Sequence, residues 1–226
     1  MRSPTLPMTE PGSNGIRAVV SDFGGVLTTP LLAAFAAFQE DSGISPEALG
    51  KAMRVGLEQG EDLPLFRLER GEISEAEFIE RLEDGLEAIL DHRPRLNHFR
   101  RQFWGALEPN AEMIELMREL KASGLTMALL TNNVREWEPL WRSMLPVDEI
   151  FEDVVDSAFV GCRKPEARIY ELTLERIGIS AEACLFVDDL HPNCEGAEAA
   201  GMRAVHFRDN EQAIGEIRAA LDLARS

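Results

Sequence analysis

Three short apolar segments, each ending in polar residues, restrict the fold of this chain more than any other feature. IRAVVSD ends at Asp22, LTMALLTNN ends in Thr131 and two asparagines, and ACLFVDD ends in Asp188 and Asp189. Short β-branched and apolar runs without polar alternation are typical of strands covered on both faces of a sheet. A fourth run of this kind, MRAVHF, comes later in the chain. We therefore expect a parallel sheet with polar side chains at the strand ends.

Helical patterns separate these predicted strands. The segment NAEMIELMRELKASG repeats apolar residues at spacings of three and four, which is one face of a helix. Two more helices are expected from Pro165 to Gly178 and from Pro192 to Gly201, because proline favours a helix start and glycine a helix end. This alternation predicts an α/β fold with a doubly wound, Rossmann-like parallel sheet.

The region from residue 30 to residue 108 has a different character. It contains no strand-like run but four helical stretches, LLAAFAAFQED, PEALGKAMRVGLEQ, EAEFIERLEDGLEAILD and LNHFRRQFWGAL. We predict that residues 30–108 form an all-helical subdomain, inserted into an α/β core made of residues 16–29 and 109–226. The first 15 residues lack an apolar segment and are expected to form a flexible polar tail.

The charge of the chain excludes two classes of partner. Its 226 residues include 40 acidic and 23 basic side chains, for a formal net charge of −17. A surface this acidic repels phosphate backbones and anionic lipid, so we expect neither nucleic acid nor a membrane as a partner. Three cysteines without a metal-ligand spacing are typical of a reducing compartment, which predicts a cytoplasmic protein. We expect a monomer or a homodimer.

Much of this negative charge lies in the predicted insert. Between Glu58 and Asp91 there are 12 acidic and 3 basic residues, whereas the next ten residues hold four arginines and no acid. Charges on amphipathic helices usually form a solvated face, and we expect the same here.

The polar strand ends are expected to meet at one edge of the sheet, where such sheets bind ligands. Three carboxylates, one hydroxyl and the ammonium of Lys164 would converge there. Carboxylates that lie close together repel one another, and a set of oxygen ligands with room for water favours Mg²⁺. The cation would hold an anion near Asp22, which could attack it as a nucleophile. These parts fit phosphoryl transfer, whose catalysis is mostly positioning and charge neutralisation.

The motifs DFGGVL, LLTNN, RKPEARIY and FVDDLHPN, in this order, resemble those of the haloacid-dehalogenase-like hydrolase superfamily. The resemblance covers the chain from about Ile16 to Phe207, and the subgroup it resembles contains the phosphatase domain of soluble epoxide hydrolases and sugar-phosphate phosphatases. The helical insert is similar to the cap of that superfamily, and LERGEISEAEF is similar to a stretch common in such caps.

The resemblance implies that Asp22 is the nucleophile and forms an aspartyl-phosphate. It implies that Mg²⁺ is held by Asp22, the backbone carbonyl of Gly24 and Asp189, with Asp188 nearby through water. The expected substrate is a small phosphorylated metabolite.

The same resemblance assigns Thr131 and Lys164 to binding of the phosphoryl group. The backbone amides after Asp22, at Gly24 and Gly25, would complete the phosphate cradle. Asn132 either contacts the substrate or fixes a loop, and the sequence favours neither role.

One position departs from the family pattern. Related phosphatases usually carry an acid two residues after the nucleophile, where this chain has Gly24. General acid–base help is typically worth about 10²–10⁴ in rate. The sequence therefore predicts a slow Mg²⁺-dependent phosphatase that acts best on good leaving groups. The alternatives are a catalytically weak relative that binds a phosphometabolite or a partner, and a halide-removing enzyme, which would not need the Asp188–Asp189 pair.

Overall fold

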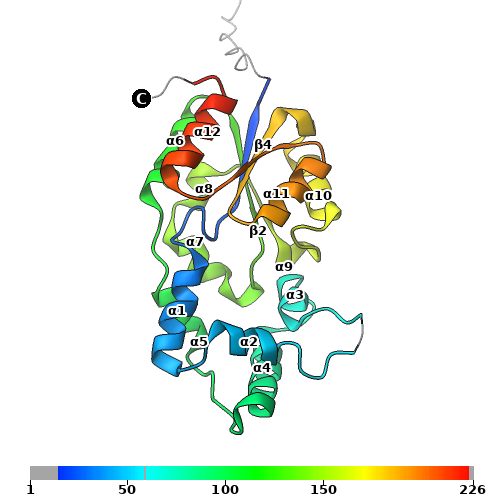
Figure 1. The fold of residues 1–226 in the computed structure, drawn as a ribbon. Coiled ribbons are helices and arrows are strands. Elements are labelled where there is room, and N and C mark those ends of the chain that lie inside the picture. Colours follow the sequence, from blue (N-terminus) through cyan, green and yellow to red (C-terminus); the bar gives the residue numbers. More distant parts are fainter. Residues whose placement is uncertain (1–14, 59, 224–226) are drawn as a thin grey trace, which may run out of the picture.

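A single parallel sheet organises the computed structural model, which describes residues 15–58 and 60–223 (Figure 1). The order of its strands is β3-β2-β1-β4-β5. The strands are Ala18–Ser21 (β1), Thr126–Thr131 (β2), Asp153–Asp156 (β3), Cys184–Asp188 (β4) and Arg203–His206 (β5). Of the tail predicted for residues 1–15, all but Gly15 lies outside the described residues.

The register of the sheet brings the predicted strand ends to one edge. Ser21 of β1 is level with Leu129 of β2 and Val187 of β4, and all pairings are parallel. The next level therefore holds Asp22, Leu130 and Asp188, and Thr131 lies one residue further along β2. β1 lies at the centre of the sheet, so its end is flanked by polar residues from both neighbours.

Helices cover both faces of the sheet. They are Ala111–Ala122 (α6), Arg135–Trp137 (η1), Glu138–Met144 (α7), Val147–Ile150 (α8), Ser157–Val160 (α9), Ala167–Ile177 (α10), Ala181–Ala183 (η2), His191–Ala199 (α11) and Asn210–Ala220 (α12). Val19 packs with α6 and α12 in one apolar cluster, whereas its neighbours Ala18 and Val20 pack with α10 and α11 in another. This alternation shows three layers, and the predicted α/β fold class is confirmed.

Two predicted helix starts need correction. α10 begins at Ala167 rather than at Pro165, because Glu166 keeps an extended backbone as the N-cap. α11 begins at His191, one residue before the expected Pro192. In both cases proline lies near the helix start but does not mark it.

Five helices lie between β1 and α6, and we call them the cap. They are Leu31–Ser42 (α1), Pro46–Ala52 (α2), Pro64–Glu69 (α3), Glu75–Leu90 (α4) and Phe99–Gly105 (α5). Their apolar side chains form a third cluster, which also includes Val134 and Trp137 from the core. The sequence predicted four helices: α3 was missed, and α2 is shorter than expected because it ends at Ala52. The domain boundaries at residues 30 and 108 stay a prediction.

The two chain connections between the sheet and the cap lie side by side. Thr28 and Pro109 form an antiparallel bridge, and the N–H of Thr29 donates to the carbonyl of Glu108 at 2.8 Å. The chain thus passes between the sheet and the cap at one narrow, two-stranded junction next to the end of β1.

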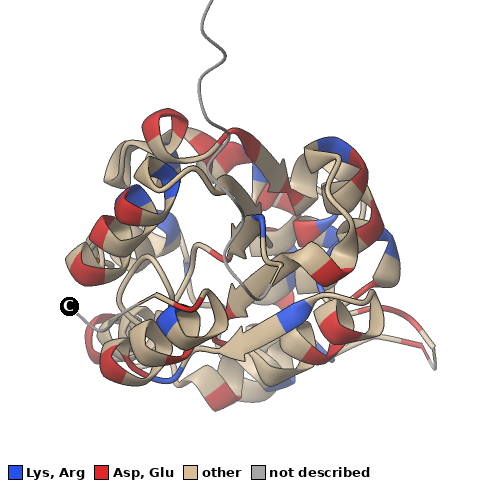
Figure 2. Ribbon diagram, turned by 90° about the horizontal axis from the view of Figure 1, so that it is seen from above, with Lys and Arg blue, Asp and Glu red and all other residues tan. Residues whose placement is uncertain are grey.

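Acidic residues are spread over the helices on all sides of the sheet (Figure 2). In the cap, three arginines that follow the acidic stretch pair with carboxylates of α4. Arg95 lies 3.2 Å from Glu83 and Arg100 lies 3.1 Å from Glu75, while Arg93 contacts Glu83 and its neighbours. These arginines therefore offset part of the negative charge of α4. No helix in the described part of the chain is both long and apolar enough to cross a membrane.

Candidate active site

Asp22 occupies the first position beyond β1. Its backbone N–H still donates to the carbonyl of Val187 at 2.8 Å, so the strand geometry continues through this residue. The Ser21 hydroxyl donates to the carbonyl of Asp22 at 2.7 Å. The hydrogen bond from the Asp22 N–H to Val187 and the one from the Ser21 hydroxyl to the Asp22 carbonyl together fix the backbone of Asp22, and with it the direction of the side chain.

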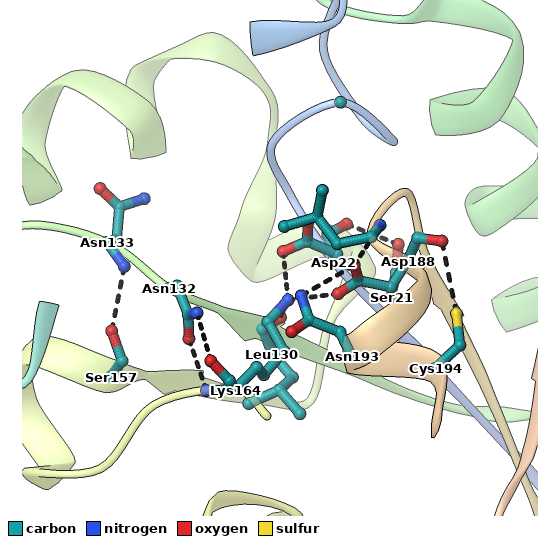
Figure 3. Close-up of polar contacts among 12 residues, drawn as sticks. Ser21, Asp22, Leu130, Asn132, Asn133, Ser157, Lys164, Asp188, Asn193 and Cys194 are labelled. Atoms are coloured by element: carbon teal, nitrogen blue, oxygen red, sulfur yellow. Dashed lines mark hydrogen bonds and ion pairs between the residues drawn. The ribbon is translucent and has the colours of Figure 1, made fainter. Parts of the chain in front are cut away.

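Lys164 is the centre of the polar contacts in Figure 3. Its Nζ donates to Asp22 Oδ1 and to Asp188 Oδ2, both at 2.6 Å, and to the carbonyl of Leu130 at 2.9 Å. The side chain is only 1% exposed. An ammonium has three protons to donate, and all three have an acceptor here.

Asp188 and Asp189 have different surroundings although they are adjacent. Both oxygens of Asp188 accept hydrogen bonds, Oδ2 from Lys164 and Oδ1 from the Leu190 N–H and the Asn193 amide. Among the described residues, no residue other than Asp189 itself donates a hydrogen bond to the Asp189 carboxylate. Asp188 is therefore anchored by the protein, whereas the Asp189 carboxylate is available for a ligand.

Gly25 allows Asp189 to approach the chain after Asp22. A Cβ at this position would lie 2.4 Å from Asp189 Oδ2, closer than any real contact, and φ is +80°. Glycine is the residue that tolerates both conditions. Carboxylate oxygens of Asp22, Asp188 and Asp189 lie within 4.8 Å of one another.

This donor set fits Mg²⁺. The ligands are oxygen atoms only, which is what this cation prefers. Three carboxylates and the one ammonium of Lys164 leave an excess of two negative charges in a buried site, and a divalent cation would balance them.

The charges of the site shift the protonation equilibria. Burial, reinforced by Asp188, raises the pKa of Asp22 to about 8, although Lys164 opposes the shift. Burial and Asp188 also raise the pKa of Asp189 to about 6. Burial alone would lower the pKa of Lys164, but Asp188 and Asp22 outweigh it and hold this pKa above its ordinary value. The carboxylates thus carry an electrostatic cost that a bound cation would relieve.

Thr131 and Asn132 follow each other at the end of β2 but differ in their contacts. The Thr131 side chain is 2% exposed, and its hydroxyl has no hydrogen-bond partner among the described residues. The Asn132 amide donates to the carbonyl of Lys164 at 3.0 Å and accepts from the Lys164 N–H at 2.8 Å. Asn132 therefore fixes the backbone of Lys164, and its contact with a substrate stays a prediction.

Gly24 lies beneath a side chain of the cap. A Cβ added at Gly24 would be 3.3 Å from both terminal methyl groups of Leu31, the first residue of α1. Leu31 thus covers the place where the usual second acid would project.

The sequence alone did not single out two residues, Tyr170 and Ser157, whose hydroxyl groups bind the backbone next to the candidate active site. The Tyr170 hydroxyl donates to the carbonyl of Asn193 at 2.8 Å, and the Ser157 hydroxyl accepts from the Asn133 N–H at 3.0 Å. Tyr170 is the only tyrosine of the chain and ends the motif RKPEARIY, which was the available signal. Ser157 follows a short strand, β3, and nothing in the sequence distinguished it.

A model of the haloacid dehalogenase-like hydrolase family matches residues 16–201, well over half of the chain. A sesquiterpene phosphatase from Aspergillus oryzae is 35% identical over 125 residues, which are 52% of this chain and 60% of that protein. Acyl-CoA dehydrogenase family member 10 from Mus musculus is 28% identical over 219 residues, which are 96% of this chain and 20% of that protein. This chain therefore corresponds to only part of either relative.

A solved structure shares the fold. A HAD family enzyme from Bacteroides thetaiotaomicron, in complex with magnesium and inorganic phosphate, superimposes with a TM-score of 0.66. The two sequences are 21% identical, and the superposition covers 85% of this chain and 94% of the other.

Proposed function

Since this chain belongs to the haloacid dehalogenase-like hydrolase family, we propose that it is a Mg²⁺-dependent phosphatase that hydrolyses a small phosphomonoester. One observation carries the proposal: Asp22 is held by Lys164, at 2.6 Å, at the sheet edge where two further carboxylates gather. A buried carboxylate with a cation on one side is suited to attack an anionic phosphoryl group.

The reaction would proceed in two steps. The Asp22 carboxylate attacks phosphorus, a bond from Asp22 to phosphorus forms, and the bond to the ester oxygen breaks. Water then attacks the aspartyl-phosphate, which releases inorganic phosphate and restores Asp22. The Thr131 hydroxyl, which has no partner among the described residues, would bind a phosphoryl oxygen, where negative charge builds up. Lys164 would bind another by exchanging one of its three present acceptors for it. The backbone amide at Gly24 would add one more donor, whereas the Gly25 N–H, which the sequence also assigned to the cradle, already donates to the Thr28 hydroxyl at 3.1 Å.

Mg²⁺ would be held by Asp22, Asp189 and the carbonyl of Gly24. Asp188, whose oxygens are already engaged by the protein, would act through water. The cation supplies charge neutralisation for the phosphoryl group and the carboxylates. Asn193 and Lys164 hold Asp188 in place.

The leaving group decides the substrate class. Position 24 is a glycine covered by Leu31, so it supplies no carboxylate to protonate the leaving oxygen. A leaving group that departs without protonation avoids this loss, so we propose an aryl, anomeric or acyl phosphate as the preferred kind of substrate. The curated relative from Aspergillus oryzae acts on a sesquiterpene phosphate by its name, which is consistent with a phosphatase role.

We place the protein in the cytoplasm, because its three cysteines are buried and free.

The contact of Leu31 with Gly24 also favours a second candidate function, the binding of a phosphometabolite. If Leu31 and Gly24 leave the chemical step without any acid, the site would bind a phosphometabolite and turn it over negligibly. The two candidates share their ligand and differ in whether phosphate is released.

Phosphate release from an aryl phosphate and from a panel of phosphometabolites, with Mg²⁺ and with a chelator, tests the proposal. We expect Mg²⁺-dependent release that is lost in Asp22→Asn and retained in Asp148→Asn, a matched change at an exposed carboxylate. Tight binding of the panel without release would favour the binding function. Release that persists in Asp22→Asn would contradict both the nucleophile and the mechanism.

A further inference from the structure

Three consecutive cap residues, Glu69, Arg70 and Gly71, contact the core segment that carries Lys164. This segment, residues 158–166, runs from α9 to the start of α10, and we call it the lysine segment. Figure 1 shows α3 next to α9, at a distance from the two-stranded junction that connects the cap to the sheet. The cap therefore meets the core at a second place, through side chains and without a chain connection.

The first contact is a nearly buried ion pair. Arg163 Nε donates to Glu69 Oε2 at 2.5 Å, and the two side chains are 13% and 16% exposed. The Arg163 guanidinium also lies over the ring of Phe66, 4.1 Å from its centroid. A shielded pair of this kind is screened less by salt than a surface pair, and separating it leaves buried charge uncompensated.

The second contact involves the residue on the other side of Lys164. Arg70 Nε donates to Glu166 Oε1 at 2.7 Å. The other oxygen of Glu166 accepts from the Arg163 N–H at 3.2 Å, so this carboxylate closes the turn of the lysine segment. A second nitrogen of Arg70 donates to Asp62 at 2.8 Å, which ties the arginine to the cap.

The third contact requires the absence of a side chain. A Cβ at Gly71 would lie 2.2 Å from the carbonyl oxygen of Ala158 and 2.7 Å from the Arg135 guanidinium. The same guanidinium donates to the Ala158 carbonyl at 2.6 Å. Glycine thus allows the cap backbone to lie directly against the lysine segment.

Lys164 itself is fixed from the core side. Asn132 holds its backbone in both directions, and its Nζ is held by Asp22, Asp188 and the Leu130 carbonyl. The cap holds the residues on either side, Arg163 and Glu166. We propose that Glu69, Arg70 and Gly71 are positioning residues, which dock the cap on the lysine segment and thereby set the place of the Lys164 ammonium. The effect on turnover rests on the proposed function, whereas the effect on the lysine segment does not.

Hydrogen–deuterium exchange of the full chain tests the docking without any substrate. Glu69→Gln removes the charge that holds Arg163, and we expect the amides of residues 158–166 to exchange at least about tenfold faster, since a loss near 1.4 kcal/mol is tenfold in an opening equilibrium. The matched control is Glu83→Gln, which removes a buried cap carboxylate that also pairs with arginine but faces away from the core. It is expected to leave exchange of these amides unchanged.

A glycine pair gives an independent test if Glu69→Gln fails to fold. Gly71→Ala and Gly43→Ala place the same Cβ in similar backbone conformations, with φ of +68° and +73°. The Cβ at Gly71 meets the Ala158 carbonyl, whereas nothing lies within 4 Å of the one at Gly43. Faster exchange of residues 158–166 in Gly71→Ala alone supports the docking role.

Steady-state kinetics on an aryl phosphate then separates positioning from general stability. We expect Glu69→Gln and Gly71→Ala to lower kcat by about ten- to a hundredfold, the cost of a small displacement of a catalytic group. The two control variants, Glu83→Gln and Gly43→Ala, are expected to keep the wild-type kcat. We expect this even where a control lowers Tm as much as its test variant does. Equal exchange and equal kcat in each test variant and its control would overturn the proposal. A wild-type chain without phosphatase activity would refute the proposed function, and the exchange experiment would still decide the docking.

Discussion

Both terminal methyl groups of Leu31 lie 3.3 Å from the point where a side chain at Gly24 would begin. The backbone at Gly24 is not in the left-handed region, so this position accepts a side chain if Leu31 moves. The missing acid is thus accompanied by an apolar residue that fills its place.

This contact predicts how an acid could be added. Gly24→Asp alone must push Leu31 aside, so we expect only a small gain in turnover of alkyl phosphates. Combined with Leu31→Ala, we expect a larger gain, up to the roughly 10²–10⁴ that general acid–base help supplies. Steady-state phosphate release measures both. Leu32→Ala, at an exposed neighbour, is the control, and equal rates for the single and the double variant would show that Leu31 is no obstacle.

The two adjacent aspartates should respond differently to substitution. In Asp189→Asn we expect the rise in Tm caused by Mg²⁺ to be lost with little change of stability in chelator, because no other described residue donates to this carboxylate. In Asp188→Asn we expect lower stability in chelator, because Lys164 and Asn193 lose a charged partner. For the wild type, Mg²⁺ at a hundred times its Kd would add about 2.7 kcal/mol. Thermal unfolding against Mg²⁺ concentration measures these shifts, and a full Mg²⁺ response in Asp189→Asn would exclude it as a ligand.

Removal of the Lys164 ammonium should make stability depend on the cation. Lys164→Met leaves the carboxylates of Asp22 and Asp188 buried without a counter-charge, and breaking a buried pair costs about 3–5 kcal/mol. We expect this loss in chelator and partial recovery in Mg²⁺, measured by urea unfolding. Lys121→Met, at a lysine paired with Glu152 near the surface, should change stability little in either condition. A loss that is the same with and without Mg²⁺ would separate Lys164 from the cation site.

We expect the free energy of unfolding to depend on pH through Asp156, a buried carboxyl that is not one of the candidate active-site residues. Burial raises the pKa of this carboxyl from 3.8 to about 6, although the Ala158 N–H opposes the shift. A folded pKa above the unfolded one means that folding favours the protonated form. The free energy of unfolding should therefore fall as pH rises from about 4 to 6 and level off above that range, by on the order of 2–3 kcal/mol.

Asp156→Asn keeps the acceptor for Ala158 and removes the titration. The difference in free energy of unfolding between wild type and variant, measured with urea from pH 4.5 to 7.5, should change in favour of the variant as pH rises. A difference that is constant over this range would contradict the raised pKa.

The apolar pattern of the sequence was sufficient to predict the strands of the sheet and the polar residues at their ends, because buried parallel strands leave a clear apolar pattern. For that reason the sequence located Asp22, Thr131 and Asp188 at strand ends, while their roles stay a prediction. Helix α3 was missed since six residues are too few for a helical period to show. The prediction at Pro165 was wrong because proline fits an extended segment as well as a helix start, and local sequence does not decide between them.

Contacts between the cap and the core could not be predicted. Leu31 is one apolar residue among many in α1, and its position over Gly24 depends on how the cap packs. Glu69 and Arg163 are 94 positions apart, and their pairing depends on the docking of α3. Such contacts arise from tertiary structure, which a pattern of local residues does not contain.

The bridge between Thr28 and Pro109 has a consequence for engineering this chain. Because the outgoing and returning strands meet there, a short turn could join them in place of the cap without altering the order of the sheet. A different cap joined at this junction would preserve the chemistry only if it also supplied contacts like those that Glu69, Arg70 and Gly71 make with the lysine segment.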